Sequence, residues 1–289
     1  MVSPVPKVEI DHVSMKYLTL EGETEALQDI CLSIAEGEFV SIVGPSGCGK
    51  STLLSLISGL LKPTRGRILI DGVPLQGITH KLGYMLQQDY LFEWRTIYNN
   101  VILGLEIQGK DKRSIRRQVD DLLQRYGLWD FRHHYPHQLS GGMRQRVALI
   151  RTLAINPDIL LLDEPFAALD YQTRLYLEDE VATILKGEGK TVILVTHDIS
   201  EAVAMSDRVI VLSRRPGRVK ADIKIMFAAG RLMPFATRKA PEFRHYFNRI
   251  WEELDIHVEG TPASKTKQLP GQGCPNPGTC PVPEENPPA

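Results

Sequence analysis

Residues 44–51 have the types and spacing needed to hold phosphate groups, because they read G-P-S-G-C-G-K-S. The strand-like run 38–43 leads into this loop, and the helix-like run 52–57 leaves it. Glycines let successive backbone N–H groups turn toward a phosphate, and the start of a helix adds unpaired N–H groups. The loop therefore predicts a site for a nucleoside triphosphate. The alternative is a glycine-rich turn that matches by chance.

The individual side chains of this loop predict distinct roles. Lys50 supplies a cation for the outer phosphates, and Ser51 supplies a hydroxyl for Mg²⁺. Cys48 occupies a variable position, which we interpret as a small filler without a catalytic role. We expect the nucleotide to contact the loop and the residue after it: Gly44, Pro45, Ser46, Gly47, Cys48, Gly49, Lys50, Ser51 and Thr52. The loop alone does not separate kinases, GTPases, motors and transport ATPases.

Two adjacent carboxylates follow another apolar run. Residues 159–162 are I-L-L-L, and Asp163 and Glu164 come directly after them. A continuous apolar run indicates a parallel strand that is covered on both faces. Such a strand places Asp163 near the phosphate loop, where it can hold Mg²⁺ through water, and lets Glu164 orient or deprotonate an attacking water. The alternative is an acidic pair that matches a helix dipole.

Two further segments suit anion binding at the same sheet edge. Residues 139–145 read L-S-G-G-M-R-Q, so Ser140 can cap a helix whose first residues, Gly141 and Gly142, expose backbone N–H groups. An ordinary capped helix explains this segment equally well. His197 ends the apolar run 192–196, and polar side chains at the carboxyl ends of parallel strands line the ligand crevice of open α/β sheets.

Strand-like and helix-like segments alternate from residue 7 to about residue 219, which predicts an α/β fold around a mainly parallel sheet. An amphipathic helix is predicted over 111–126, with Gly127 ending it, and another over 240–254. The insert between residues 96 and 157 is therefore predicted to be a helical subdomain. The predicted strands span 8–13, 30–34, 38–43, 67–70, 159–162 and 191–196.

The composition excludes several classes of protein. The chain has 289 residues, is 43% hydrophobic and carries a net charge of -1, so nothing in its bulk composition suggests a nucleic-acid surface. No apolar run approaches the ~18 residues needed to span a bilayer, and the N-terminus lacks a signal peptide, so we expect a cytosolic chain. Residues 260–289 are rich in Pro and Gly and are expected to remain disordered. Cys274 and Cys280 lie there, and acidic residues are the only further metal ligands near them in the sequence.

Taken together, these motifs resemble the nucleotide-binding subunit of an ATP-binding cassette (ABC) importer over residues 8–219. The phosphate loop, the segment 139–145, the acidic strand 160–164 and His197 occur in the family's order. The resemblance adds Gln87 as the Q-loop glutamine, the segment 168–170 as the D-loop, and Tyr17 as the aromatic residue that stacks on adenine. Gln88 is the alternative Q-loop position, and a plain surface tyrosine is the alternative at position 17.

The resemblance implies a fold with a P-loop ATPase core at 7–96 and 157–225. That core would have a mixed, mainly parallel sheet and an antiparallel β portion. The remaining parts would be an inserted helical subdomain at 97–156 and a C-terminal helical extension at 226–259.

The resemblance also implies a catalytic assembly. Two copies would pair head to tail, with ATP between one phosphate loop and residues 140–142 of the other copy. Lys50, Glu164 and His197 would act on ATP, Ser51, Gln87 and Asp163 would hold Mg²⁺, and Asp170 would contact the partner.

The family further implies partners at the membrane: a separate transmembrane permease and an extracellular solute-binding protein, with this chain on the cytoplasmic face. The segments W-R-T at 94–96 and S-R-R-P-G-R at 213–218 resemble the branch that imports nitrate, sulfonates and taurine. Glu93 departs from that branch, in which proline is usual. The competing functions are an ABC ATPase that acts on nucleic acid or ribosomes, a small-molecule phosphoryl-transfer enzyme, and an exporter.

Overall fold

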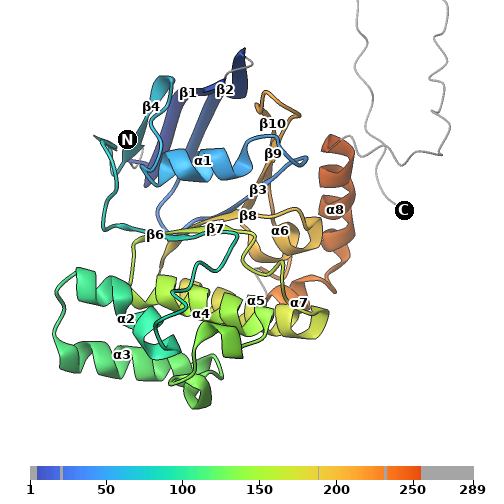
Figure 1. Cartoon of the computed structure of the whole chain (residues 1–289). Helices are drawn as coiled ribbons and strands as arrows, with labels where there is room; N and C mark the ends of the chain where they lie inside the picture. The colour runs from blue at the N-terminus through green and yellow to red at the C-terminus, as the bar shows by residue number, and fades with distance from the viewer. Residues whose placement is uncertain (1–4, 20–21, 188, 231–232, 255–289) are drawn as a thin grey trace, which may run out of the picture. The chain divides into compact units, whose positions relative to one another are not determined.

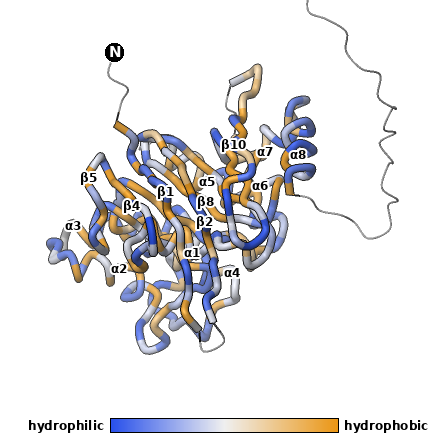
Figure 2. The backbone as a smooth tube through the Cα atoms, turned by 90° about the horizontal axis from the view of Figure 1, so that it is seen from above, coloured by the Kyte–Doolittle hydropathy of each residue, from blue (hydrophilic) through white to orange (hydrophobic). Residues whose placement is uncertain are grey.

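Two β-sheets and a set of helices form the structure, a computed structural model that describes residues 5–19, 22–187, 189–230 and 233–254. A six-stranded central sheet lies between an antiparallel four-stranded sheet on one side and a group of helices on the other (Figure 1). Hydrophobic residues concentrate along the strands in the middle of the molecule (Figure 2). The predicted α/β fold with a mainly parallel sheet and an antiparallel portion is confirmed.

The central sheet has the strand order β10-β9-β3-β8-β7-β6. All its pairs are parallel except β10 with β9. Every residue of β3, β7 and β8 is buried, because both faces of these strands are covered. The strands span Phe39–Val43 (β3), Leu82–Met85 (β6), Ile159–Asp163 (β7), Thr191–Val195 (β8), Arg208–Leu212 (β9) and Val219–Lys224 (β10).

The antiparallel sheet has the order β2-β1-β4-β5, and helix α1 lies between it and the central sheet (Figure 1). Its two long strands extend well beyond the predicted segments 8–13 and 30–34. Register shifts between β1 and β2 break the alternation of apolar and polar residues. The sequence pattern therefore predicted only part of each strand. The elements are β1 (Val8–Thr19), β2 (Gly22–Ile34), α1 (Lys50–Ile57), β4 (Arg65–Ile70) and β5 (Val73–Pro74).

The segment 97–156 packs its helices against the other face of the central sheet (Figure 1). The amphipathic helix predicted over 111–126 is present as α3, with Val119 and Leu123 fully buried. Gly127, with φ +65°, follows it. The elements are α2 (Ile97–Ile107), α3 (Lys112–Arg125), two 3₁₀ turns, η1 (Trp129–Phe131) and η2 (Pro136–Gln138), and α4 (Gly141–Ala154).

The remaining helices are α5 (Tyr171–Gly187), α6 (Ile199–Met205), α7 (Pro234–Thr237) and α8 (Pro241–Glu253). The helix predicted over 240–254 is α8, which packs against α6 and buries Ile250 completely. None of the described helices is both long enough and apolar enough to cross a membrane. The predicted tail, with Cys274 and Cys280, lies outside the described residues.

Candidate site for nucleotide binding and hydrolysis

The phosphate loop joins β3 to α1 and borders a pocket of about 330 Å³. Gly47 and Gly49 have φ of +74° and +106°, which side-chain-bearing residues rarely adopt. A Cβ on Gly49 would also lie 3.0 Å from the carbonyl oxygen of Ala26, so this position needs a glycine on two grounds. The pocket is lined by Ala26, Ser46, Gly47, Gly49, Lys50, Ser51, Thr52, Gln87, Glu164 and Arg215.

Lys50 is the cation at the base of this loop, and only 8% of its surface is exposed. Its ammonium donates hydrogen bonds to the carbonyl oxygens of Gly44 (2.8 Å) and Pro45 (3.1 Å). These carbonyls hold the charge within the turn, at the beginning of α1. The ammonium and the first N–H groups of the helix therefore present positive charge to the same pocket.

Asp163 ends strand β7 and is buried beside the phosphate loop. Burial raises the pKa of its carboxyl, while the hydrogen bond from the Ser51 hydroxyl and the charge of Lys50 oppose that shift. Mg²⁺ prefers oxygen ligands, so a hydroxyl and a carboxylate in direct contact form a donor set that fits this ion.

Glu164 is a carboxylate that two other predicted site residues contact, the metal ligand Gln87 and the catalytic His197. Its Oε2 accepts a hydrogen bond of 3.2 Å from Nε2 of Gln87 and lies 3.2 Å from Nδ1 of His197. Its backbone has φ +49°, and its N–H donates to the carbonyl of Val195. The end of β7 thus brings the glutamine, the carboxylate and the histidine together, and it is Gln87, not Gln88, that makes the contact.

Gln145 is a polar residue that sequence reasoning treated only as the end of a motif. Its side chain donates to the carbonyl of Glu164 and accepts from the N–H of Ala168, both at 3.1 Å. It is 5% exposed. Helix α4 therefore anchors the backbone that carries the carboxylate and the segment that leads to Asp170. The sequence shows this glutamine only as the last residue of the segment 139–145, and no pattern there marks it as buried.

Arg215 is a second residue that the sequence did not assign to the pocket. Its loop, 213–218, packs against β2 and the phosphate loop: the N–H of Gly217 donates to the carbonyl of Ala26 in β2 (2.9 Å), and a Cβ on Gly217 would overlap the carbonyl oxygen of Cys48 in the phosphate loop. The sequence could not reveal this, because the contact joins segments far apart in the chain. The structure thereby adds a cation to the pocket.

Ten predicted site residues are not among those that line this pocket: Tyr17, Gly44, Pro45, Cys48, Ser140, Gly141, Gly142, Asp163, Asp170 and His197. Ser140 caps α4 as predicted, accepting a hydrogen bond from the N–H of Met143, but neither it nor Gly141 and Gly142 lines the pocket of its own chain among the described residues. Asp170 caps α5 by accepting from the N–H of Thr173.

Tyr17 and Cys48 are the other positions with separate expectations. Tyr17 lies at the pocket's side, with its hydroxyl 3.3 Å from that of Thr52. Cys48 is buried, and burial raises the pKa of its thiol.

A buried acid, Glu201, forms a hydrogen bond with the residue that precedes His197. Glu201, in α6, is 4% exposed and accepts a hydrogen bond of 2.8 Å from the hydroxyl of Thr196. Burial, with a contribution from the nearby charge of Glu178, raises the pKa of Glu201 to about 8. The folded protein therefore keeps this carboxyl protonated at neutral pH, whereas the unfolded chain ionises it near 4.5.

We expect Glu201→Gln to flatten the pH dependence of stability. Because the folded pKa is raised, the unfolded state of the parent holds fewer protons between pH 4.5 and 8, and the free energy of unfolding falls as pH rises through this window. Glutamine does not titrate, so the variant should gain stability relative to the parent from pH 5 to pH 8. Urea denaturation at both pH values measures this. Glu36→Gln, at an exposed acid, is the control and should keep the pH dependence of the parent. If the free energy of unfolding falls equally from pH 5 to pH 8 in Glu201→Gln and Glu36→Gln, the expectation is contradicted.

Comparison with known proteins places the chain. The family model described as "ABC transporter" matches residues 27–167. The "Uncharacterized ABC transporter ATP-binding protein YtlC" of Bacillus subtilis is 48% identical over 248 residues, which cover 86% of this chain and 95% of the relative. The "Taurine import ATP-binding protein TauB" of Roseobacter denitrificans is 40% identical, with coverage of 85% and 94%.

A solved structure has the same fold. The chain resembles the dimeric post-hydrolysis state of the ATP-binding cassette MJ0796 bound to ADP and Pi, with a TM-score of 0.69 and 37% identity. The match covers 75% of this chain and 98% of that one. The relatives share much of their sequence with this chain, and the solved structure shares its fold; the chain also has the phosphate loop and the acidic strand end. The chain therefore belongs to the ABC transporter ATP-binding proteins and is an ATPase of that family.

Proposed function

We propose that this chain is the ATP-hydrolysing subunit of an importer and that it works as a head-to-tail homodimer. The carrying observation is that one chain has two helix ends suited to phosphate, yet only the start of α1 faces its own pocket. Residues Ser140 and Gly141 are exposed at the start of α4, where a second copy can reach them. MJ0796, which shares the fold, is dimeric in its solved structure. ATP would then join the two copies, and hydrolysis would release them.

Within that dimer, the side chains at the start of α1 and at the end of β7 would have different roles. Lys50 would neutralise charge on the phosphoryl group that is transferred. Glu164 would orient the attacking water and accept its proton, and His197 would contact the γ-phosphate.

The oxygen ligands and the remaining predicted contacts complete the proposed site. Ser51, Gln87 and Asp163 would hold Mg²⁺, which neutralises phosphate charge when bound. Asp170 would contact the partner, and Tyr17 would stack on adenine.

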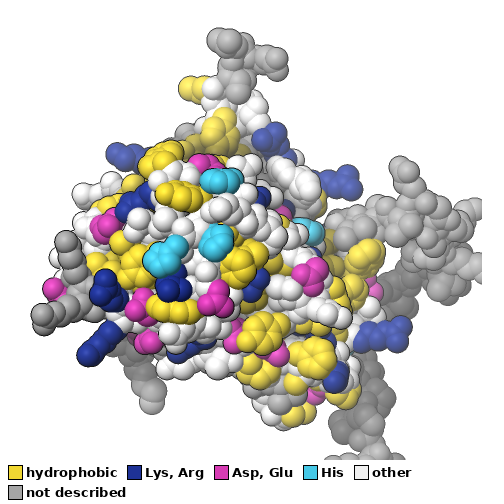
Figure 3. Space-filling view, turned by 60° about the horizontal axis from the view of Figure 1, so that its bottom comes forward, with side chains coloured by type: hydrophobic (Ala, Val, Ile, Leu, Met, Phe, Trp, Pro, Cys, Tyr) yellow, Lys and Arg dark blue, Asp and Glu magenta, His cyan; other side chains and the backbone are white. Residues whose placement is uncertain are grey.

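The helical side of the molecule is proposed as the docking surface for a permease. Tyr90 and Trp94 follow Gln87 and are 58% and 75% exposed. Arg151 of α4 donates to the carbonyl oxygens of Asp89 and Tyr90, so their segment is tied to the helix that carries the Ser140 end. Figure 3 views this side, where apolar side chains are exposed among basic, acidic and histidine side chains. A shift of Gln87 at the nucleotide can thus reach the membrane partner.

The solute is proposed to be a small anion or zwitterion such as nitrate, a sulfonate or taurine. Two relatives named for taurine import, from Roseobacter denitrificans and Yersinia pestis, are 40% and 45% identical. In this system a permease and an extracellular solute-binding protein would choose the solute, and the chain would lie on the cytoplasmic face of the membrane. Genes for both partners beside this one would support the proposal, whereas co-purification with nucleic acid would favour an ABC ATPase that acts on it.

Mixing two inactive variants tests the shared site. Lys50→Ala disables the phosphate loop, and Gly141→Asp places a negative charge at the other helix end, where a Cβ meets little besides the side chain of Arg144. A mixed dimer has one site in which both parts are intact. Random pairing at equal amounts should restore about a quarter of the intact sites. We therefore expect ATPase activity to reappear on mixing, and a mixture as inactive as its components would contradict the head-to-tail dimer.

A further inference from the structure

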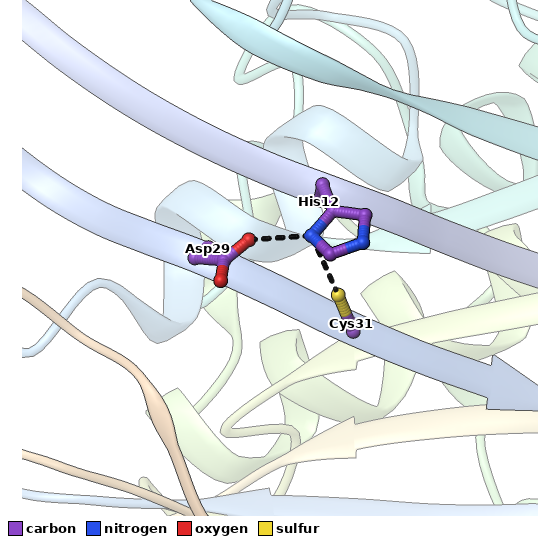
Figure 4. Close-up of side chains that lie close together, drawn as sticks. All are labelled: His12, Asp29 and Cys31. Atoms are coloured by element: carbon purple, nitrogen blue, oxygen red, sulfur yellow. Dashed lines mark hydrogen bonds and ion pairs between the residues drawn. The ribbon is translucent and has the colours of Figure 1, made fainter.

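We infer that His12, Asp29 and Cys31 form a binding site for Zn²⁺ on the antiparallel sheet. The imidazole Nδ1 of His12 lies 2.7 Å from Oδ1 of Asp29 and 3.4 Å from Sγ of Cys31 (Figure 4). Among the described residues, this is the group in which three such ligand atoms lie within 4.8 Å of one another. Cys31 is a free, exposed thiol. Nothing in the ATPase chemistry uses these side chains.

Paired irregularities in β1 and β2 produce the cluster. Val8, Ile10 and Val13 are buried, so the inward face of β1 skips one residue between positions 10 and 13, where the register with β2 shifts. Without this shift, His12 would point into the core in regular alternation. Instead it has φ +50° and an exposed side chain. The irregularity in β1 therefore turns the imidazole of His12 to the outer face of the sheet.

The partner strand shows the matching feature. Leu27 and Ile30 are both buried, so the inward alternation of β2 is also broken between them, and Asp29 has φ +52°. Cys31 follows on the outer face. The side chains of Asp29 and Cys31 therefore flank the imidazole from across the hairpin (Figure 4).

The chemical types of the three ligand atoms suit zinc, and their separations are close to those of a zinc site. Zn²⁺ binds thiolate, imidazole and carboxylate together, at metal–ligand distances of about 2.0–2.3 Å. In a tetrahedron those distances separate neighbouring ligand atoms by about 3.4–3.6 Å. The 3.4 Å between His12 and Cys31 matches that separation. The 2.7 Å between His12 and Asp29 is a hydrogen bond that must lengthen, and both side chains are free to move, being 70% and 66% exposed.

Charge and access favour a cation with an open fourth position. The carboxylate of Asp29 and the thiol of Cys31, which loses its proton when it binds a metal ion, place negative charge on both sides of the imidazole. Three protein ligands at an exposed place leave water as the fourth ligand. The bound ion would link β1 to β2.

The test is a zinc titration of the full-length protein with Mg²⁺ and ATP present, so that the nucleotide site is occupied. A chromophoric zinc chelator competes for the ion, and Co²⁺ provides a second probe through thiolate-to-cobalt charge-transfer absorption. We expect one zinc per chain to be lost or bound at least ~10-fold more weakly in His12→Asn, Asp29→Asn and Cys31→Ser. Asparagine is chosen for positions 12 and 29 because it tolerates a positive φ.

A control variant tests whether other cysteines bind the zinc. Cys274→Ser/Cys280→Ser removes two cysteines that lie outside the described residues, and it should keep the zinc and the cobalt absorption. ATPase activity should be unchanged in all these variants, which shows that they fold. If the parent takes up no zinc, or if Cys31→Ser binds it as tightly as the parent does, the three side chains are only an exposed hydrogen-bonded cluster and the inference is wrong.

Discussion

Replacing Glu164 by glutamine should lower ATP turnover by at least ~10²-fold while leaving ATP binding intact. Both Gln87 and His197 contact this carboxylate, each at 3.2 Å. Glutamine has the same shape but cannot accept the proton of the attacking water. The backbone at this position is held by the carbonyl of Val195 and by the side chain of Gln145, so the variant should fold normally. Steady-state phosphate release and equilibrium nucleotide binding measure the two effects.

The same substitution should also trap the proposed dimer. If ATP joins two copies and is no longer cleaved, the closed pair persists, and light scattering in the presence of ATP should report a dimer that disappears without nucleotide. Glu23→Gln makes the same chemical change at an exposed acid paired with Lys16 and should leave turnover unaltered. Normal turnover in Glu164→Gln would remove this residue from its proposed role.

Local patterns were sufficient where function depends on consecutive residues. A strand, a glycine-rich turn and a helix are coded by neighbouring positions, so the phosphate loop and the start of α1 could be predicted. The same holds for the cap that Ser140 provides for α4 and for the buried strand β7 that ends in Asp163. In each of these cases the side chains and the turn chemistry of one short segment decide the structure.

Contacts between distant segments could not be predicted in this way. Arg215 reaches the pocket because Gly217 packs on Cys48, and no periodicity within 213–218 encodes that approach. Residues His12 and Asp29 take positive φ because the hairpin register shifts, which depends on how two strands fit one core. The resemblance to a family supplied Gln87, whose place beside Glu164 depends on the pairing of β6 with β7.

Lys50→Ala should abolish tight ATP binding, with at least ~10²-fold loss of affinity, because a charge-assisted hydrogen bond to phosphate contributes about 1.5–3 kcal/mol and one ammonium can make two. The carbonyls of Gly44 and Pro45 already hold this ammonium inside the turn, so no other described cation can take its place without rebuilding the loop. Arg215 lies at the same pocket but on a separate loop, and it should not compensate.

Titration with a fluorescent ATP analogue gives the affinity of Lys50→Ala, and thermal unfolding without nucleotide shows whether the variant is folded. Lys224→Ala, at an exposed lysine of β10, controls for the loss of one positive charge and should bind like the parent. A ligand raises the free energy of unfolding only when it binds the folded protein. The parent and Lys224→Ala should therefore melt at a higher temperature when ATP is added, whereas Lys50→Ala should not. Unchanged affinity in Lys50→Ala would mean that the loop does not hold the phosphates, and the assignments of Ser51 and Glu164 would lose their basis with it.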